Sequence, residues 1–201
     1  MVSKKAADLI IQFEIGGRSV YDKSYQKPTW PGGESGITIG IGVDLGYTTD
    51  KEFMAVWSPS LNLNFINALR PTIGLKGQKA KSMLKGEILN VRVPYNVAYE
   101  VFVKHTLPKF YKAALTIYPE MIHLNEDTQG ALVSMVFNRG TSLAGDRRKE
   151  MKAIIDLVKL KDYEGIAEEI EKSKRLWEGA GMDGLVIRRE AEADLIRNSI
   201  A

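Results

Sequence analysis

The segment GITIGIGVDLGY, residues 36–47, restricts the fold more than any other part of the chain. Apolar and mostly β-branched residues alternate in it with threonine, aspartate and glycine, and this period of two is typical of a β-strand. One face of such a strand is apolar, and the other carries only Thr38, Asp44 and glycines. A strand face cleared by Gly40 and Gly42 permits a substrate or another backbone to approach closely. The alternative is a tight hairpin in which the glycines serve turn geometry.

The distance between Thr38 and Asp44 depends on which alternative holds. In a fully extended strand the two residues would lie about 20 Å apart, at ~3.3 Å per residue. They could not then bind the same water molecule. They can act together only if the chain turns or bulges at Gly40 or Gly42, which glycine permits.

The rest of the chain has mostly helical patterning. Residues 3–14 predict a short amphipathic helix, because Leu9, Ile10 and Phe13 recur at helical spacing and two glycines follow it. Residues 18–36 are rich in proline and glycine, which is typical of a loop. Further helices are expected over 50–57, 61–69, 78–85, 94–117 (in two pieces, because of Pro108), 126–138, 145–159, 162–177 and 183–200.

The predicted fold is therefore α+β and mostly α, with a small N-terminal β-hairpin or sheet and a larger helical lobe. A length of 201 residues suits one domain, 1–201, with a β-containing lobe at about 14–60. The small residues Gly130 and Ser134 allow close helix approach. Trp57 and Trp177 are expected in the core, Asp183 as a helix cap, and Arg188 and Arg189 in ion pairs on helix surfaces, with partners such as Glu190 or Glu192.

Composition excludes several classes of protein. The chain has no cysteine, which rules out disulfides and thiolate metal sites, and His105 and His123 lack a metal-ligand spacing. We expect no metal and no cofactor. A formal net charge of +3 is too small for a nucleic-acid-binding protein but suits weak attraction to an anionic polymer. The N-terminal residues do not have the pattern of a signal peptide, and no stretch is long and apolar enough to insert into a membrane.

Glu14 is a candidate general acid. It ends the first predicted helix, where the helix dipole disfavours an anion. A carboxyl walled in by Phe13 and the following glycines would have its pKa raised by desolvation and could stay protonated. A carboxylic acid and a carboxylate across a groove are what glycoside hydrolysis requires.

The motifs FEIGG at 13–17 and SGITIGIGVDLGY at 35–47 resemble the opening of the phage-type lysozymes, and most closely the pesticin-like lysozymes and endolysins. In that family a helix-borne glutamate precedes a Thr-Ile-Gly-x-Gly strand and then an aspartate, which here correspond to Glu14, Thr38 and Asp44. TQGALVSMVFNRG at 128–140 resembles the central helix of these proteins, and GLVIRREAEADLI at 184–196 resembles their closing helix.

The resemblance implies a muramidase that cuts the β-1,4 bond between N-acetylmuramic acid and N-acetylglucosamine in bacterial peptidoglycan. Glu14 would donate the proton, and Asp44 and Thr38 would position a water, with inversion as the expected course. Asp22, in YDKSY, competes with Asp44 as the second carboxylate, because simpler phage lysozymes place the aspartate before the threonine. The expected substrate-binding residues are Tyr21, Gly40, Gly42, Tyr47 and Asn138; Trp30 is a further candidate for sugar stacking.

The implied setting is that of an endolysin, monomeric, made in the host cytoplasm and acting at the periplasmic or extracellular cell wall after release. A bacteriocin or secreted effector is the other setting. Three further functions stay open. A chitinase-like or other glycosidase would act on a related amino-sugar polymer. A lytic transglycosylase would need only Glu14 and would leave 1,6-anhydromuramyl ends. A non-catalytic wall-binding module would bind peptidoglycan without releasing soluble fragments.

Overall fold

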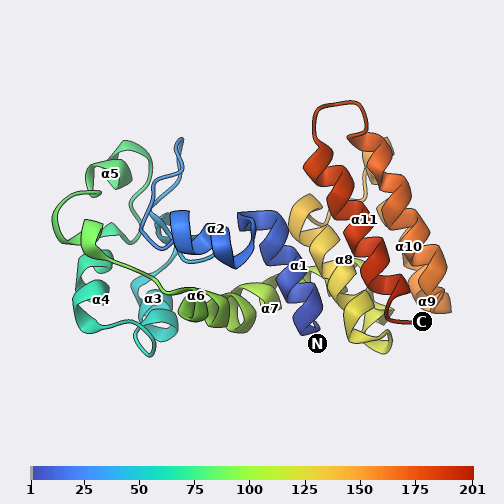
Figure 1. Cartoon of the computed structure of the whole chain (residues 1–201), viewed down its shortest axis with the longest axis horizontal. Helices are drawn as coiled ribbons and strands as arrows, with labels where there is room; N and C mark the ends of the chain where they lie inside the picture. Colours follow the sequence, from blue (N-terminus) through green and yellow to red (C-terminus); the bar gives the residue numbers. More distant parts are fainter. Residues whose placement is uncertain (1) are drawn as a thin grey trace. The chain divides into compact units, whose positions relative to one another are not determined.

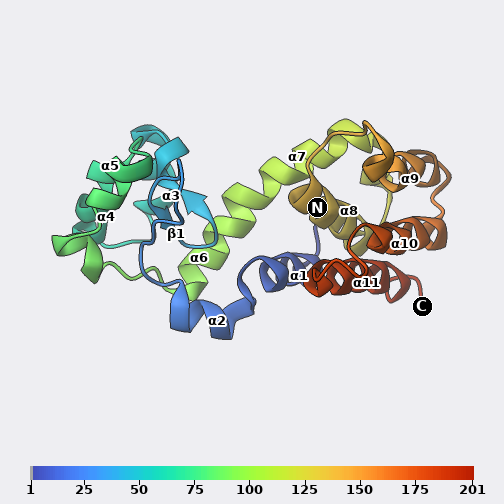
Figure 2. The same ribbon diagram turned by 90° about the horizontal axis from the view of Figure 1, so that it is seen from above.

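The computed structural model describes residues 2–201, which divide between two compact units (Figure 1 and Figure 2). The hairpin unit is Glu14–Thr106, and the helical unit combines residues 2–13 with Leu107–Ala201. The first helix, α1 (Lys4–Ile15), begins in the helical unit, and its last two residues belong to the hairpin unit. The fold is α+β and mostly α, as the sequence predicts.

The only sheet among residues 2–201 is a short antiparallel hairpin, which is one of the two alternatives that the sequence leaves open for residues 36–47. β1 (Thr38–Ile39) pairs with β2 (Val43–Asp44), and Gly40 and Gly42 in the intervening turn have φ angles of 59° and 73°. These angles lie in the left-handed region, which glycine adopts without a steric penalty. The predicted N-terminal β-hairpin is confirmed, and the alternative of one extended strand is excluded because the two glycines bend the chain back on itself.

Short helices surround the hairpin. Figure 2 shows α3 beside β1, and Trp57 of α3 is buried, as the sequence predicts. The loop predicted over 18–36 is wrong in its first part, because Gly16, at a φ of 73°, lets the chain turn and start a second helix. The helices of this unit are α2 (Gly17–Ser24), α3 (Asp50–Trp57), α4 (Leu63–Leu69), α5 (Gly77–Ser82) and α6 (Tyr95–Val101).

The helical segment predicted over 94–117 consists of two pieces, as predicted, but the break precedes the proline. A π-helical stretch, Phe102–Thr106, separates α6 from α7 (Leu107–Ile117). Pro108 is the second residue of α7. Inside a helix a proline removes one backbone hydrogen bond and its ring crowds the carbonyl four residues earlier, which here is that of Lys104 in the π-helical stretch.

The helical unit is built around α8 (Glu126–Arg139), in which most residues are buried. A Cβ atom added to Gly130 would lie 2.0 Å from the Cβ of Ala6, so the absent side chain lets α1 pack directly against α8. This is the close helix approach that the sequence predicts. The remaining helices are α9 (Lys149–Leu160), α10 (Tyr163–Lys172) and α11 (Asp183–Arg197), and α10 and α11 lie side by side (Figure 1).

Arg188 and Arg189 are not on a helix surface, contrary to the sequence-based expectation. Both are buried, as are Glu192 and Ser134. The Oε1 atom of Glu192 accepts hydrogen bonds from Ser134 Oγ (2.5 Å), Arg188 Nε (3.2 Å) and Arg189 Nη2 (2.8 Å). Buried charges persist where they are paired in this way, and a helical pattern alone does not distinguish such a cluster from a solvated face.

The expectations for Trp177 and Asp183 have different outcomes. Trp177 is buried, as predicted. Asp183 does not cap α11: the residue before the helix is Met182, and Asp183 is the first helical residue. An acidic residue in the first turn still interacts favourably with the helix dipole, so the preference for aspartate at this position has a physical basis without a capping bond.

Candidate active site

Thr38 and Asp44 face each other across the hairpin. The register pairs them directly, and the backbone N–H and C=O of Thr38 bond instead to Thr29, at 2.7 and 3.0 Å. Thr38 and Asp44 are therefore a non-hydrogen-bonded pair, in which side chains lie on the same face with Cβ atoms about 4.5–5.5 Å apart. Among residues 2–201 the Thr38 hydroxyl has no hydrogen-bond partner. The hairpin thus brings together the two side chains that an extended strand would separate.

Backbone N–H groups fix the orientation of the Asp44 carboxyl. Its Oδ1 atom accepts from Gly46 (2.8 Å) and Gly36 (2.9 Å), and its Oδ2 atom is 3.1 Å from the Gly36 nitrogen. The bond from Gly46 caps the 3-10 helix Leu45–Tyr47. A Cβ atom on Gly36 would lie 2.4 Å from Oδ1, so a larger residue there would displace the carboxyl.

The positioning role of Gly36 and Gly46 is missing from the sequence prediction. The signal for Gly46 was present, because an aspartate two residues before a glycine in a turn often accepts from that N–H. No local pattern identifies Gly36, which reaches Asp44 only after the chain has folded into the hairpin.

Glu14 lies in the last turn of α1 and is exposed. The enclosure by Phe13 and the glycines that the sequence suggests is therefore not found. Gly16 and Gly17 both adopt positive φ angles, which turn the chain away after the helix. An exposed carboxyl at the end of a helix is accessible to a ligand.

Asp22 lies on helix α2 and not in a loop. It is exposed, and its carboxylate contacts Arg18 Nε of the same helix at 3.5 Å and Gln26 Nε2, just beyond the helix, at 3.1 Å. Contacts at spacings of four residues are ordinary for the surface of a helix. Asp44, in contrast, lies opposite a threonine with an open hydroxyl, and this arrangement favours Asp44 as the second carboxylate.

The two tyrosines expected to stack on sugars differ in exposure. Tyr21 is fully buried, and its hydroxyl donates to the backbone carbonyl of Val93 at 3.0 Å. Burial raises the pKa of this phenol well above its usual range. The expectation for Tyr21 is wrong, because its apolar ring packs in the core of the hairpin unit. Tyr47 is 66% exposed and can contact a ligand.

The two turn glycines also differ. Gly40 is buried, and a Cβ atom there would lie 2.8 Å from the ring of Trp57. The expectation that Gly40 clears space for substrate is wrong, since the space is filled by tryptophan. Gly42 is exposed and has no atom within 4 Å of an added Cβ, so it leaves open surface.

Asn138 belongs to the helical unit. It is exposed near the end of α8, and the helix ends at Gly140, where φ is 70°. Its role in substrate binding stays a prediction.

A scan against protein-family models matches the phage lysozyme family over residues 20–192. The chain belongs to the phage lysozyme family. This membership indicates a glycosidase-type enzyme that degrades peptidoglycan. The matched range contains Asp22, Thr38 and Asp44, and it begins after Glu14. A search of curated proteins found no match.

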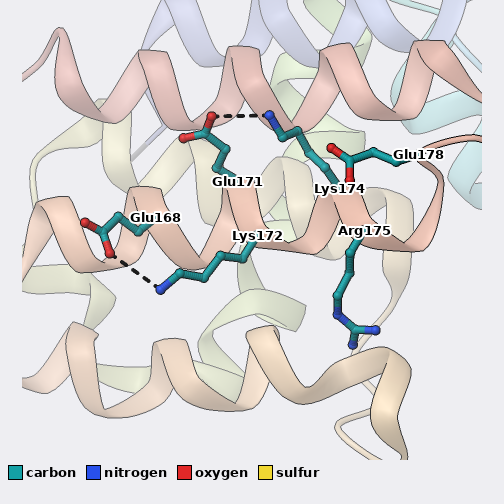
Figure 3. Close-up of a pocket in the computed structure, with 6 residues that line it drawn as sticks. All are labelled: Glu168, Glu171, Lys172, Lys174, Arg175 and Glu178. Atoms are coloured by element: carbon teal, nitrogen blue, oxygen red, sulfur yellow. Dashed lines mark hydrogen bonds and ion pairs between the residues drawn. The ribbon is translucent and has the colours of Figure 1, made fainter.

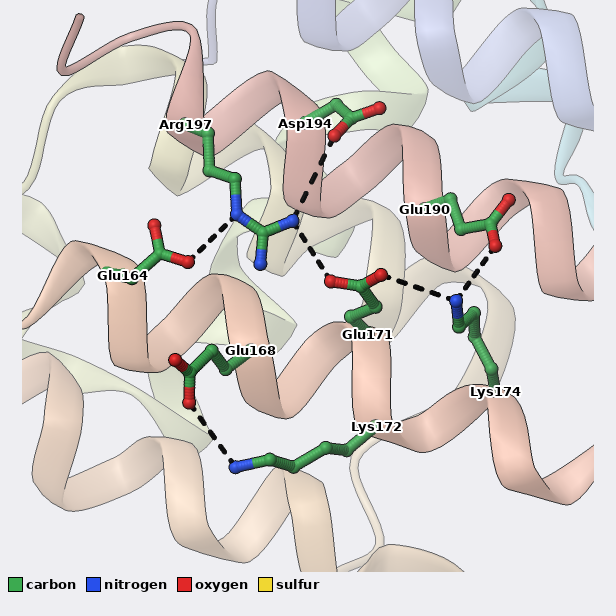
Figure 4. Close-up of polar contacts among 8 residues, drawn as sticks. All are labelled: Glu164, Glu168, Glu171, Lys172, Lys174, Glu190, Asp194 and Arg197. Carbon is green, nitrogen blue, oxygen red and sulfur yellow. Dashed lines mark hydrogen bonds and ion pairs between the residues drawn. The ribbon is translucent and has the colours of Figure 1, made fainter.

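Two hollows of the helical unit are lined by polar and charged side chains. One, of about 310 Å³, is lined by charged side chains of α10 and the 3-10 helix Ser173–Leu176 (Figure 3). Its lysines pair with neighbouring glutamates, and Arg175 bonds to Glu150 and Asp146. Figure 4 shows further ion pairs beside it, in which Arg197 of α11 contacts Glu164 and Glu171 of α10. The other, of about 450 Å³, is lined by Ser3, Lys5, Asn125, Glu126, Asp127, Asn198 and Ser199.

A search of residues 2–201 finds no group of three or more acidic or histidine side chains that could hold a metal ion. The same part of the chain contains no helix that is both long enough and apolar enough to span a membrane.

Proposed function

We propose that the chain hydrolyses the β-1,4 bond between N-acetylmuramic acid and N-acetylglucosamine. The observation that carries the proposal is the hairpin register, which sets Thr38 opposite Asp44 in the unit that also contains Glu14. Family membership supports the substrate class. Together, the two residues of the hairpin and the exposed glutamate supply the groups that glycoside hydrolysis needs.

In the proposed mechanism, Glu14 protonates the glycosidic oxygen as the bond to the anomeric carbon breaks. Asp44 accepts a proton from a water that attacks the anomeric carbon from the opposite face, which inverts the configuration. The open hydroxyl of Thr38 holds this water. The backbone bonds from Gly36 and Gly46 keep the Asp44 carboxylate in one orientation, and a fixed acceptor needs no reorganisation during the reaction. Tyr47 and Gly42 offer the accessible surface beside these groups.

The whole chain, residues 1–201, is proposed to act as one catalytic domain. The proposed setting is an endolysin that acts on the wall as a monomer after release from the host cytoplasm.

The decisive experiment compares wild type with Glu14→Gln on purified peptidoglycan. We expect a loss of about 10²–10⁴-fold in the release of reducing ends, the range for removal of a general acid, with matching circular dichroism and melting. Asp22→Asn is the matched control, since it removes an exposed carboxylate of the same unit, and it should retain activity. A folded Glu14→Gln protein with wild-type activity would falsify the assignment of the acid.

A lytic transglycosylase is the second candidate, because the three backbone contacts of Asp44 give it a structural role that needs no catalysis. Mass spectrometry of the products separates the two. Hydrolysis gives reducing ends, and a transglycosylase gives 1,6-anhydromuramyl ends. A pool of anhydro ends, together with high activity in Asp44→Asn, would replace the proposed hydrolysis by the alternative.

A further inference from the structure

Two exposed lysines of the hairpin unit each lie over an aromatic ring. The Nζ atom of Lys76 is 3.5 Å from the centroid of the Tyr47 ring, and that of Lys81 is 5.1 Å from the centroid of the Trp30 ring. Ammonium groups are attracted to the faces of aromatic rings at such distances. Tyr47 nevertheless remains 66% exposed, and Trp30 is half-buried. Each pair therefore presents an accessible aromatic surface beside a positive charge.

The two pairs are held close together by one short loop. Tyr47 Oη is 3.5 Å from the carbonyl oxygen of Glu34, and Trp30 Nε1 donates to the carbonyl of Ser35 at 3.0 Å. These carbonyls belong to neighbouring residues. The carbonyl of Ser35 also accepts from the backbone N–H of Gly77, at 3.0 Å, which ties the segment carrying both lysines to the same loop. The four side chains thus form one surface, the lysine–aromatic patch.

The lysine–aromatic patch adjoins the candidate active site. Gly36, the residue after Ser35, donates to the Asp44 carboxylate. Residues 76–85, KGQKAKSMLK, contain four lysines and no acid. An acidic residue, Glu34, also lies at the patch, with its Oε1 atom 3.6 Å from the position of a Cβ on Gly77. The lysines therefore make the patch positively charged, and the carboxylate of Glu34 reduces that charge.

We propose that the lysine–aromatic patch binds the peptide-bearing part of the peptidoglycan strand, with its lysines on the carboxylates of the stem peptides. Aromatic rings fit the apolar faces of sugar rings, and ammonium groups form charge-assisted hydrogen bonds to carboxylates. A muramyl residue with its stem offers both features side by side. A phosphate-rich wall polymer is the poorer fit, because Glu34 would repel a dense row of anions. The inference rests on the proposed function, which makes peptidoglycan the substrate.

The test measures adsorption to purified sacculi from which teichoic acids have been removed. The Glu14→Gln background prevents digestion. Lys76→Gln with Lys81→Gln should adsorb about fivefold more weakly, the effect of losing two exposed ion pairs. Lys112→Gln with Lys152→Gln removes two exposed lysines of the helical unit and is the matched control, expected to change adsorption less than twofold.

Two further preparations identify the ligand. Sacculi whose carboxylates have been amidated with methylamine should abolish the difference between the two double variants. Tyr47→Ala should weaken adsorption to both the native and the amidated preparation, because ring stacking needs no carboxylate. Sacculi that retain teichoic acid should give the same fivefold ratio as those without it.

The proposal is overturned if the two double variants adsorb equally, or if the patch variant differs from the control only when teichoic acid is present. In the second case the ligand is a phosphate polymer. Adsorption does not require cutting, so failure of the proposed function has a different signature. It appears as a wild-type protein that adsorbs through the patch and releases no fragments.

Discussion

In the hairpin unit, Thr38 and Asp44 lie on two strands of two residues each, whereas the helical unit contains helices of 10 to 15 residues. The hairpin is held by backbone hydrogen bonds, by glycines with positive φ and by the backbone contacts of Asp44. The helical unit is held by buried packing and by paired charges, both inside it and on its surface. Active-site geometry and bulk stability therefore depend on different interactions in different parts of the chain.

The largest effect on stability is expected from Glu192→Gln in the helical unit. The substitution keeps the size of the side chain but removes the negative charge that pairs with Arg188 and Arg189. Breaking a buried ion pair on one side costs about 3–5 kcal/mol of the free energy of unfolding. Urea denaturation measures this loss, and hydrogen exchange should rise in α8 and α11.

Glu190→Gln is the control for that substitution. Glu190 pairs with Lys174 on the same helical unit, but its side chain is 44% exposed. The expected loss is under about 1 kcal/mol. Equal stability of the two variants would mean that the buried cluster does not hold the helical unit together.

A smaller loss is expected from Gly40→Ala in the hairpin. Alanine at a φ of 59° costs about 1–2 kcal/mol in backbone strain, and its Cβ would press on Trp57 at 2.8 Å. Hydrogen exchange should rise in residues 38–44 and α3 but not in α10. Activity should fall as well, because the turn sets the pairing of Thr38 with Asp44.

Gly42→Ala distinguishes the cost of backbone strain from the cost of the contact with Trp57. Its φ is 73°, but an added Cβ meets nothing within 4 Å, so this variant should lose only the strain of about 1–2 kcal/mol. If Gly40→Ala and Gly42→Ala are equally stable, the contact with Trp57 does not matter. If Gly40→Ala also raises hydrogen exchange in α10, the stability of the helical unit depends on the hairpin unit.

The smallest effect is expected from Glu171→Gln on the surface of the helical unit, and it depends on pH. Arg197 donates to Glu171 at 3.0 Å and lowers the pKa of its carboxyl below the ordinary 4.5 (Figure 4). A lowered pKa contributes stability that is present above the unfolded value and is lost as pH falls through the folded value. At pH 7 the variant should lose less than about 1 kcal/mol.

Melting between pH 7 and pH 2 checks this prediction. Below about pH 4.5 the difference between wild type and Glu171→Gln should shrink and disappear. Glu168→Gln is the control, because it removes an exposed carboxylate of the same helix that lies 3.5 Å from Lys172, and at pH 7 it should lower the melting temperature less than Glu171→Gln does. A constant gap between wild type and Glu171→Gln over the whole range contradicts the pairing.

The mostly helical fold and most helix positions follow from sequence because they depend on local patterns of three to four residues. The start of α3 and the small residue Gly130 in α8 are examples. The sequence did not decide between one long strand and a hairpin, because an alternating pattern fits both one strand and two short paired strands. Only the positive φ angles of Gly40 and Gly42 settle the question.

The candidate site was less predictable, because exposure depends on long-range packing. Tyr21 and Tyr47 have the same side chain, yet one fills a core and the other faces solvent. The enclosure expected for Glu14 and the surface position expected for Arg188 failed for the same reason. Periodicity shows which residues share a helix face, but not what that face packs against.

The division of the chain into two units also affects the order in which they can fold during synthesis. The hairpin unit is a single continuous stretch, Glu14–Thr106, whereas the helical unit needs residues from both sides of that stretch. During synthesis α1 emerges first, but α8, against which Ala6 packs at Gly130, emerges more than a hundred residues later. Units of a chain tend to fold as they are completed. The hairpin with its Thr38–Asp44 pair can therefore form while α1 still lacks its partner, and completion of the helical unit is the later folding step.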